Sequence, residues 1–233
     1  MINLYNMDCM IAMKEMKNKQ FDLAICDPPY GIFGSNNKKS TFGWTKKSIT
    51  KDGSGWGWGM GNKYKYGEKI SKWDIPPDDN YFKELKRVSK EQIIFGANHY
   101  PYPYINFIIW DKINIPQSFS MSMAEIASVS IRGNGKIFKC ISQNSDRFHP
   151  TQKPVRLYIW ILENYAKEGD KILDTHLGSG SIAIACHNLS YDLKGYEIDK
   201  EYYDMAVKRL EKHKKQLSIY ETNFFKEYDK YSI

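Results

Sequence analysis

The segment "KILDTHLGSGSIAIACHNLSYDLKGYEID" (residues 171–199) decides the fold. An apolar run ends at Asp174, a turn with Gly178 and Gly180 opens a helical pattern, and a second apolar run ends at Glu197. Glycines in such a turn let a ligand approach the backbone, and the free N–H groups of the helix start offer donors to it. An acid at the position of Glu197 can accept hydrogen bonds from both hydroxyls of a ribose.

The turn also limits the kind of ligand. Its Gly-Ser-Gly sequence is not the G-x-G-x-x-G pattern that seats a pyrophosphate, so a dinucleotide fits poorly. A single adenosine with a cationic or zwitterionic tail fits better, because Asp174 near the turn would repel a phosphate. The alternative is a tight turn in which the aspartate is only a structural cap.

Strand and helix patterns alternate through the rest of the chain, which is typical of a parallel sheet with helices on both faces. At 233 residues the chain is long enough for one domain, residues 1–233, with a full core. We therefore expect an α/β fold with a Rossmann-like, doubly wound, mostly parallel sheet. The expected strands are 2–5, 21–26, 92–96, 104–111, 124–132, 171–174 and 191–197, and the expected helices are 9–18, 78–89, 155–169, 181–189 and 201–216.

Composition excludes several classes of protein. No apolar run approaches the roughly 20 residues that span a bilayer, and charged residues interrupt the N-terminal stretch where a secretion signal would lie. The four cysteines form no CxxC pair, which argues against a zinc ribbon or a disulfide framework. We expect a cytoplasmic protein with no membrane partner and no metal site.

A basic segment stands out between residues 34 and 72. It holds nine lysines and two acidic residues, so its net charge equals the +7 of the whole chain. Half of the 16 glycines and three of the six tryptophans also lie there, without a steady period. A neutral body with one basic segment indicates a polyanionic partner, although a solvated lysine-rich loop is the alternative. We interpret residues 34–75 as an insertion that contacts this partner.

The stretch "AICDPPYGIF" (24–33) places an acid, two prolines and a tyrosine directly after an apolar run. Together with three later motifs, it resembles the S-adenosylmethionine-dependent DNA amino-methyltransferases of the β group, in particular phage-type adenine-N6 members. The catalytic motif comes first and the cofactor motif last, which is a circularly permuted order. The four motifs are "DPPYG" (27–31), "HPTQKPVRLY" (149–158), "ILDTHLGSGS" (172–181) and "GYEID" (195–199).

The middle of the chain also resembles phage-type members, in "SKEQIIFGANHY" (89–100), "IIWDK" (108–112) and "MAEIASVS" (123–130). We interpret "FGANHY" as packing at the floor of the substrate pocket. The cofactor motif departs from the family, because Thr175 and His176 stand where an aromatic residue after a proline is usual. Asp8 follows Met7 rather than the usual glycine.

Permutation predicts one specific strand pairing. The strand that ends at Glu197 needs a parallel neighbour, and residues 2–5 would supply it, with Asp8 at the carboxyl end. Asp8, Asp27, Asp174 and Glu197 would then all lie at the edge where open α/β sheets bind ligands.

The resemblance implies methyl transfer to an exocyclic amino group, with Asp27, Pro28, Pro29 and Tyr30 as the catalytic residues. The Asp27 carboxylate and the Pro28 carbonyl would each accept one N–H of the target amine and stabilise the charge that develops. The prolines fix the backbone, and Tyr30 would stack on a base flipped out of the duplex. No covalent enzyme intermediate is needed.

The resemblance also implies the residues that bind S-adenosylmethionine and DNA. Lys153 would suit the carboxylate of the cofactor, and Asp8 its adenine amino group. We assign no role to His149 or His176. The expected cofactor-binding residues are Asp8, Thr151, Lys153, Asp174, Gly178, Ser179, Gly180, Ser181 and Glu197, and the expected DNA-binding residues are Lys38, Lys39, Trp44, Lys46, Lys47, Trp56, Trp58 and Lys63.

The resulting prediction is a site-specific adenine-N6 methyltransferase acting on double-stranded DNA in a bacterial or phage-infected cell, associated with the nucleoid. In the family an aspartate at position 27 favours adenine over cytosine. Cytosine-N4 methylation, RNA methylation and an inactive DNA-binding module are the alternatives. Carbon-5 methylation is disfavoured because none of the four cysteines follows a proline. The sequence leaves open a homodimer, a cognate restriction endonuclease and the recognition site.

Overall fold

The computed structural model describes residues 1–31, 74–100, 105–118, 122–142 and 147–228, with side chains up to residue 216. The basic segment and all eight expected DNA-binding residues lie outside these ranges. No helix in the described part of the chain is long and apolar enough to cross a membrane.

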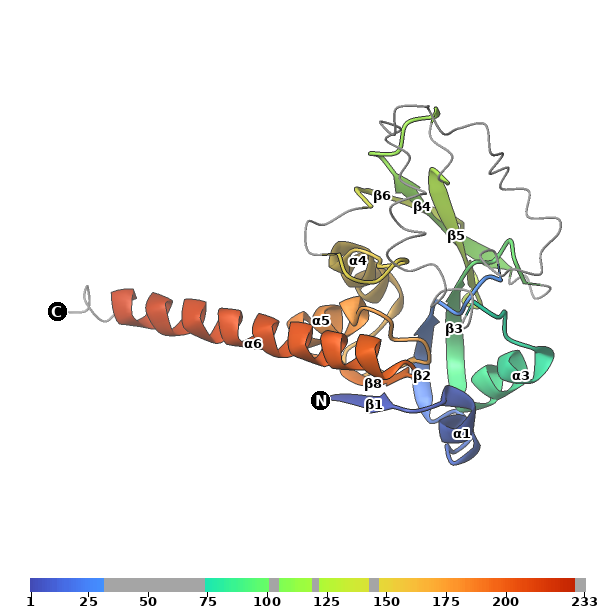
Figure 1. The fold of residues 1–233 in the computed structure, drawn as a ribbon, viewed down its shortest axis with the longest axis horizontal. Coiled ribbons are helices and arrows are strands. Elements are labelled where there is room, and N and C mark those ends of the chain that lie inside the picture. The colour runs from blue at the N-terminus through green and yellow to red at the C-terminus, as the bar shows by residue number, and fades with distance from the viewer. Residues whose placement is uncertain (32–73, 101–104, 119–121, 143–146, 229–233) are drawn as a thin grey trace, which may run out of the picture.

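One eight-stranded sheet forms the centre of the molecule, in the order β1-β8-β7-β2-β3-β5-β4-β6 (Figure 1). β5 runs antiparallel to both of its neighbours, and the other pairings are parallel. This confirms the expected mostly parallel, doubly wound sheet. The strands are β1 (Ile2–Asn6), β2 (Phe21–Cys26), β3 (Ser89–Phe95), β4 (Asn106–Lys112), β5 (Ala124–Val129), β6 (Lys136–Cys140), β7 (Lys171–Asp174) and β8 (Asp192–Glu197).

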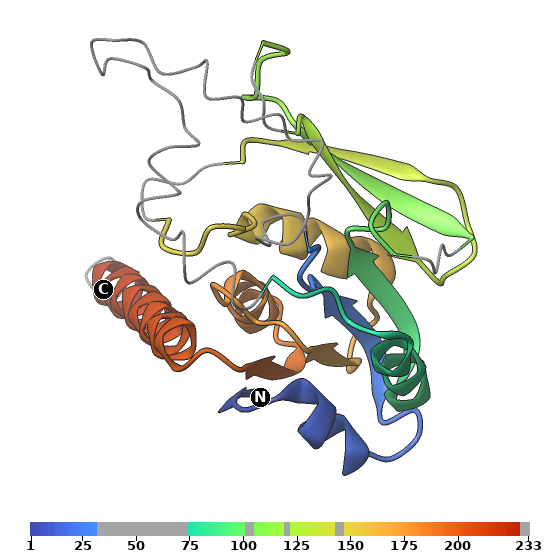
Figure 2. The same ribbon diagram turned by 45° about the vertical axis from the view of Figure 1, so that its right-hand side comes forward.

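Helices cover both faces of the sheet (Figure 2). Alternation along β2 explains the two layers, because Leu23 and Ile25 face one hydrophobic cluster while Ala24 and Cys26 face the other. The first cluster includes α4 (Val155–Tyr165), α5 (Ser181–Asn188) and α6 (Lys200–Tyr228), and the second includes α1 (Cys9–Lys14) and α3 (Asp79–Val88).

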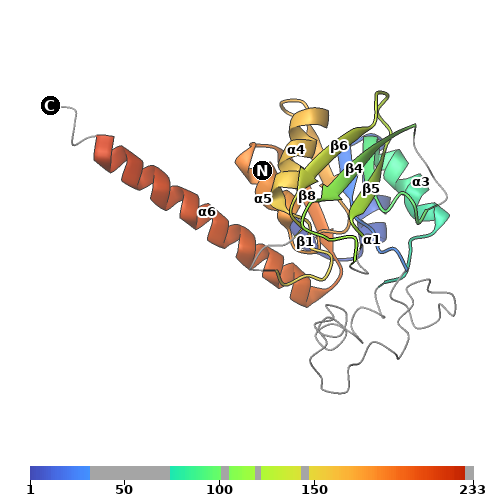
Figure 3. The ribbon, with the colours of Figure 1, turned by 90° about the horizontal axis from the view of Figure 1, so that it is seen from above.

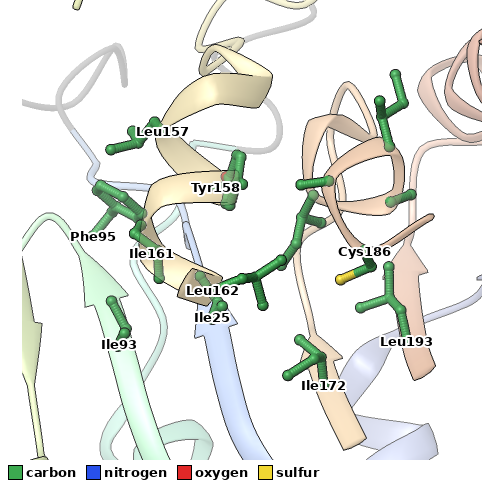
Figure 4. Close-up of a cluster of buried hydrophobic side chains, with 14 of the residues drawn as sticks. Ile25, Ile93, Phe95, Leu157, Tyr158, Ile161, Leu162, Ile172, Cys186 and Leu193 are labelled. Atoms are coloured by element: carbon green, nitrogen blue, oxygen red, sulfur yellow. The ribbon is translucent and has the colours of Figure 1, made fainter. Parts of the chain in front are cut away.

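The larger cluster is a packed apolar layer between α4, α5 and the strands. Almost all of its side chains are fully buried, which at about 25 cal/mol per Å² of apolar surface makes it a main source of stability. Figure 4 shows its members Ile25, Ile93, Phe95, Leu157, Tyr158, Ile161, Leu162, Ile172, Cys186 and Leu193.

Helix ends differ from the sequence predictions in three places, and one of these is α4, which ends at Tyr165 rather than residue 169. α1 ends at Lys14 rather than residue 18, and the Arg87 guanidinium of α3 donates to the carbonyls of Met13 and Met16 at 2.6 and 2.7 Å. These bonds satisfy carbonyls that a longer helix would have used. α6 continues well past residue 216 and extends away from the body of the protein (Figures 1 and 3).

β6 was missed by the sequence analysis. Its sequence "KIFKC" is short and charged, and three of its five residues are exposed at the edge of the sheet. Edge strands bury little, so their apolar pattern is weak. Within the part of the chain that the structure describes, β6 pairs only with β4, from Ile108↔Lys136 to Lys112↔Cys140.

The pairing predicted from the permuted order is present. β1 lies parallel to β8, from Ile2↔Leu193 to Asn6↔Glu197. β2 and β7 are parallel neighbours, with Ala24 opposite Leu173. Asp8 and Asp27, in the loops after β1 and β2, and Asp174 and Glu197, the last residues of β7 and β8, therefore lie at the same edge of the sheet.

Candidate active site

Asp27 stands directly after β2 and is held from two sides. Its Oδ1 accepts a hydrogen bond from the Tyr30 hydroxyl at 2.5 Å, and its Oδ2 forms an ion pair with the Lys153 ammonium. Burial raises the pKa of Asp27, the nearby Glu125 carboxylate adds to the rise, and the Lys153 ammonium opposes it. The side chain is 12% exposed, so the carboxylate is enclosed but reachable.

Lys153 joins the two motifs that the sequence places far apart. Its carbonyl accepts a hydrogen bond from the Ser181 hydroxyl at 2.7 Å, at the first residue of α5, while its ammonium binds Asp27. One residue thus connects the glycine turn to the loop after β2. In the structure this ammonium is paired with Asp27 and Glu125, and its expected contact with the carboxylate of the cofactor stays a prediction.

Lys153 is almost completely buried. Its ammonium lies 4.5 Å from the centre of the Phe95 ring and 3.0 Å from Glu125 Oε2. Burial lowers the pKa of Lys153, but the Asp27 and Glu125 carboxylates more than offset this and hold its pKa above the usual value. The ammonium is therefore charged throughout the physiological range.

Tyr100 holds the loop after β2 that contains Pro28 and Pro29, which we call the proline loop. The Tyr100 hydroxyl donates to the carbonyls of Pro28 and Pro29 at 2.7 and 2.9 Å. A carbonyl oxygen has two lone pairs, so Pro28 retains one acceptor position. The proline rings also fix the backbone angle φ, so the Pro28 carbonyl, which we expect to accept an N–H of the substrate, is held in one orientation.

Tyr30 lies between Gly96 and His99. Its ring is stacked on the His99 imidazole, with centroids 4.9 Å apart and planes 13° apart. Gly96 has φ +80°, and a Cβ there would lie 2.4 Å from Tyr30 Cε1. The close approach of the ring to the backbone therefore requires glycine at this position.

The glycine turn after β7 is held by Glu197. One oxygen of this carboxylate accepts from the Gly178 N–H at 2.8 Å and the other from the Asp199 N–H at 2.9 Å. Gly178 and Gly180 have φ of +52° and +70°, so both adopt the left-handed conformation that favours glycine. Gly180 is the N-cap of α5 and supplies no side-chain cap, which leaves donors of this helix start available.

Asp174, at the end of β7, is buried beside the same turn. Its Oδ1 accepts from the His176 N–H at 2.9 Å. Burial raises the pKa of Asp174 to about 8, and the carboxylates of Asp27 and Glu197 contribute to the rise. Two carboxylates and an open helix start thus surround the turn, and this donor and acceptor set suits a ligand with hydroxyl and amino groups.

The other expected cofactor residues lie close to this turn or at the same edge. Asp8 caps α1 by accepting from the Met10 N–H at 2.7 Å, so it has a structural partner in addition to any ligand. The Thr151 hydroxyl contacts His149 Nδ1 at 3.2 Å, and the ring of His149 lies against Gly178. The hydroxyls of Ser179 and Ser181 are 3.1 Å apart.

Thr175 and His176, the departures from the family motif, join a buried polar cluster. The Thr175 hydroxyl contacts the Tyr81 hydroxyl at 2.7 Å and His176 Nδ1 at 3.0 Å. Burial lowers the pKa of His176 to about 4, so the imidazole is neutral. A neutral ring packed against Tyr81 occupies the place of the usual aromatic residue.

Several residues of this site were not assigned by the sequence analysis. Gly96, His99 and Tyr100 belong to "FGANHY", which was interpreted as packing, and Tyr100 is indeed buried. Glu125 belongs to "MAEIASVS". The available signal was a lone acid at the start of an apolar strand, where a charge requires a partner.

Known methyltransferases resemble this chain over most of its length. Residues 109–208 match the sequence profile of the DNA methylase family of N6 and N4 methyltransferases. The type II methyltransferase M.HpaI of Haemophilus parainfluenzae is 26% identical over 226 residues, which cover 86% of this chain and 71% of that protein. These matches make the chain similar to DNA N4/N6 methyltransferases, with the family profile covering residues 109–208.

Solved structures show the same fold. M1.HpyAVI in complex with S-adenosylmethionine superposes with a TM-score of 0.52 and 21% identity, covering 90% of this chain and 100% of that one. The cytosine-N4-specific PvuII DNA methyltransferase superposes with a TM-score of 0.55 and 10% identity, covering 88% and 85% of the two chains. A cytosine-N4-specific enzyme thus shares this fold, so the fold does not distinguish adenine from cytosine as the target base.

Proposed function

We propose that this protein transfers the methyl group of S-adenosylmethionine to the N6 amino group of adenine in double-stranded DNA. The observation that carries the proposal is the double contact of Lys153, which sets the Asp27 carboxylate beside the glycine turn that begins α5. A methyl donor held at the turn and an acceptor held at Asp27 would then be neighbours. Aspartate at this motif position favours adenine within the family.

The acceptor chemistry requires two hydrogen-bond acceptors. The lone pair of an exocyclic amino group is delocalised into the base, so the amine is a poor nucleophile. Asp27 and the Pro28 carbonyl would each accept one N–H, which favours a pyramidal nitrogen and stabilises its developing charge. Both acceptors are already oriented, Asp27 by Tyr30 and Lys153 and the carbonyl by Tyr100.

The bonds and charges of the step balance without a further reactant. Bound S-adenosylmethionine would supply a methyl group on a positively charged sulfur, and the C–S electron pair would stay with the sulfur when the new N–C bond forms. The methylated amine then carries one proton too many. The Asp27 carboxylate, already an acceptor for that N–H, would take this proton and release it to water.

The residues of the cofactor half fit the proposed donor. Glu197 and Asp174 can accept from hydroxyl and amino groups, since each carboxylate oxygen keeps lone pairs beyond those used by the backbone. We assign the turn Gly178–Ser181, with Asp8 and Thr151, to the same binding site. Tyr30 would stack on the flipped base.

Analysis of the modified nucleosides tests the proposal. Duplex DNA incubated with the protein and S-adenosylmethionine, then digested and examined by mass spectrometry, should contain N6-methyladenine. The D27N variant, which keeps the size of the side chain, should leave the DNA unmodified while still binding the cofactor. N4-methylcytosine as the product would assign the protein to the cytosine-N4 enzymes instead. DNA without any methylated base, or preferential methylation of RNA, would refute the proposal.

A further inference from the structure

Four charged side chains form a continuous row behind the catalytic loop. Lys112 Nζ at the end of β4 lies 2.6 Å from Glu125 Oε1 on β5, and Glu125 Oε2 lies 3.0 Å from Lys153 Nζ. Lys153 pairs with Asp27 in turn. The charges alternate in sign and sum to zero. Their side chains are only 2 to 22% exposed, so water screens them weakly.

A buried row of ion pairs contributes little to the free energy of unfolding. Removing charges from water costs free energy that ion pairing only partly returns, and apolar side chains of similar size stabilise a core at least as well. Lys153 by itself would neutralise Asp27. Glu125 and Lys112 are therefore not needed to make Asp27 an anion, and their effect must lie in how strongly Lys153 binds it.

Glu125 competes with Asp27 for the same ammonium. If Asp27 were the sole partner of the Lys153 ammonium, that ion pair would be stronger. The Asp27 carboxylate would then be a weaker hydrogen-bond acceptor for the target amine. Shared between two carboxylates, the ammonium draws less charge from each one. Lys112 keeps Glu125 ionised, since burial raises the pKa of Glu125 but Lys153 and Lys112 more than offset this and bring it to about 2.

We propose that Glu125 is a positioning residue for methyl transfer, which shares Lys153 so that Asp27 stays a strong acceptor for the amino group of the target base. This inference rests on the proposed function. It assigns the charge row a role in the acceptor strength of Asp27, which differs from a role in folding. Loss of Glu125 should therefore change the reaction even when the fold is kept.

The direction of the pH effect follows from the groups around Asp27. Removing the negative charge of Glu125 leaves Lys153 wholly with Asp27, so the carboxylate should accept a proton only at lower pH. The acid side of the rate profile should move to lower pH, and the plateau rate should fall because Asp27 binds the amine less well. Among the described residues, the ionisable groups that interact electrostatically with Asp27 are Lys153, Glu125, Tyr30, Tyr100, Tyr158 and Asp174, and Lys112 lies beyond Glu125.

The experiment compares three variants with the wild type in single-turnover methyl transfer to DNA. The rate is measured between about pH 5 and pH 9, so that the acid side of each pH–rate profile is recorded. E125Q removes the shared carboxylate. The double variant K112M/E125Q removes the distant ammonium too and so restores the charge balance of the row. E91Q is the matched control, because Glu91 is a carboxylate on β3 that contacts Ser130 at the other end of β5. Urea denaturation reports the stability of each variant.

We expect E125Q to lose about tenfold to a hundredfold in plateau rate, the scale of a misplaced catalytic group, with the acid limb at lower pH. K112M/E125Q should regain stability and keep both kinetic changes, while E91Q should match the wild type. A wild-type profile in E125Q, or recovery of the wild-type profile in the double variant, would overturn the inference and leave the proposed function standing. A wild-type protein without methyl transfer would overturn both.

Discussion

Substitution of Gly96 by alanine tests how the target pocket is built. Gly96 has φ +80°, and the new Cβ would lie 2.4 and 2.7 Å from two carbons of the Tyr30 ring and 3.1 Å from Tyr100 Cε2. Atoms do not approach this closely, so the Tyr30 ring has to move. Its movement would break the stack on His99 and the hydrogen bond to Asp27.

The chain contains a matched control for the backbone effect. Gly169 has φ +81°, nearly the same conformation, but a Cβ there would meet no atom within 4 Å. An alanine at either position costs about 1–2 kcal/mol in the left-handed region. Only G96A adds the displacement of a packed ring, which for an overfilled site costs about a further 1–3 kcal/mol.

The assay combines urea denaturation with single-turnover methyl transfer. G169A should lose about 1–2 kcal/mol in free energy of unfolding and methylate DNA at the wild-type rate. G96A should be less stable than G169A and should lose about a hundredfold in rate, as expected when a reacting group is misplaced by about 1 Å. Equal stability and equal rates in the two variants would refute the assigned contact between Gly96 and Tyr30.

Two further predictions concern buried polar groups. Burial raises the pKa of Asp174 to about 8. Between about pH 4 and pH 8 the folded protein therefore binds a proton at Asp174 that the unfolded chain has lost. The free energy of unfolding of the cofactor-free protein should fall across this range as the pH rises, by up to about 1.4 kcal/mol per pH unit. D174N should remove that decline in urea titrations across this range, and an unchanged slope would contradict it. Y100F should destabilise the protein by about 1–2 kcal/mol, because the Pro28 and Pro29 carbonyls lose a shared donor. Y165F, which removes a buried hydroxyl without a hydrogen-bond partner in the described part of the chain, should be neutral or stabilising, so equal losses in both variants would count against the assigned bonds.

Much of the fold was predictable because the apolar runs in the sequence coincide with the strands of the sheet. The apolar runs ending at Asp27, Asp174 and Glu197 each became a buried parallel strand, whose two faces both lie in the core. Permutation predicted that residues 2–5 would pair beside the strand ending at Glu197, and β1 does so. β6 escaped prediction because an edge strand with few buried residues has no clear pattern.

The positions of the acidic residues in the site were predictable from the sequence, but the side-chain contacts between distant segments were not. Asp27, Asp174 and Glu197 are found at one edge of the sheet because carboxyl ends of parallel strands coincide there. The partners of Lys153 were not predictable, since they depend on Glu125, which an antiparallel strand brings to the site from outside the motifs. Side-chain contacts between distant segments have no period or spacing that reveals them.

The central claim is that the end of β2 carries out the transfer while the ends of β7 and β8 hold the cofactor. The most direct test measures S-adenosylmethionine binding by calorimetry and single-turnover methyl transfer on the same preparations of D27N and E197Q. D27N should bind the cofactor as the wild type does and transfer no methyl group, whereas E197Q should bind it weakly and regain transfer as the cofactor concentration rises. Loss of cofactor binding in D27N together with wild-type binding in E197Q would contradict this division of the site.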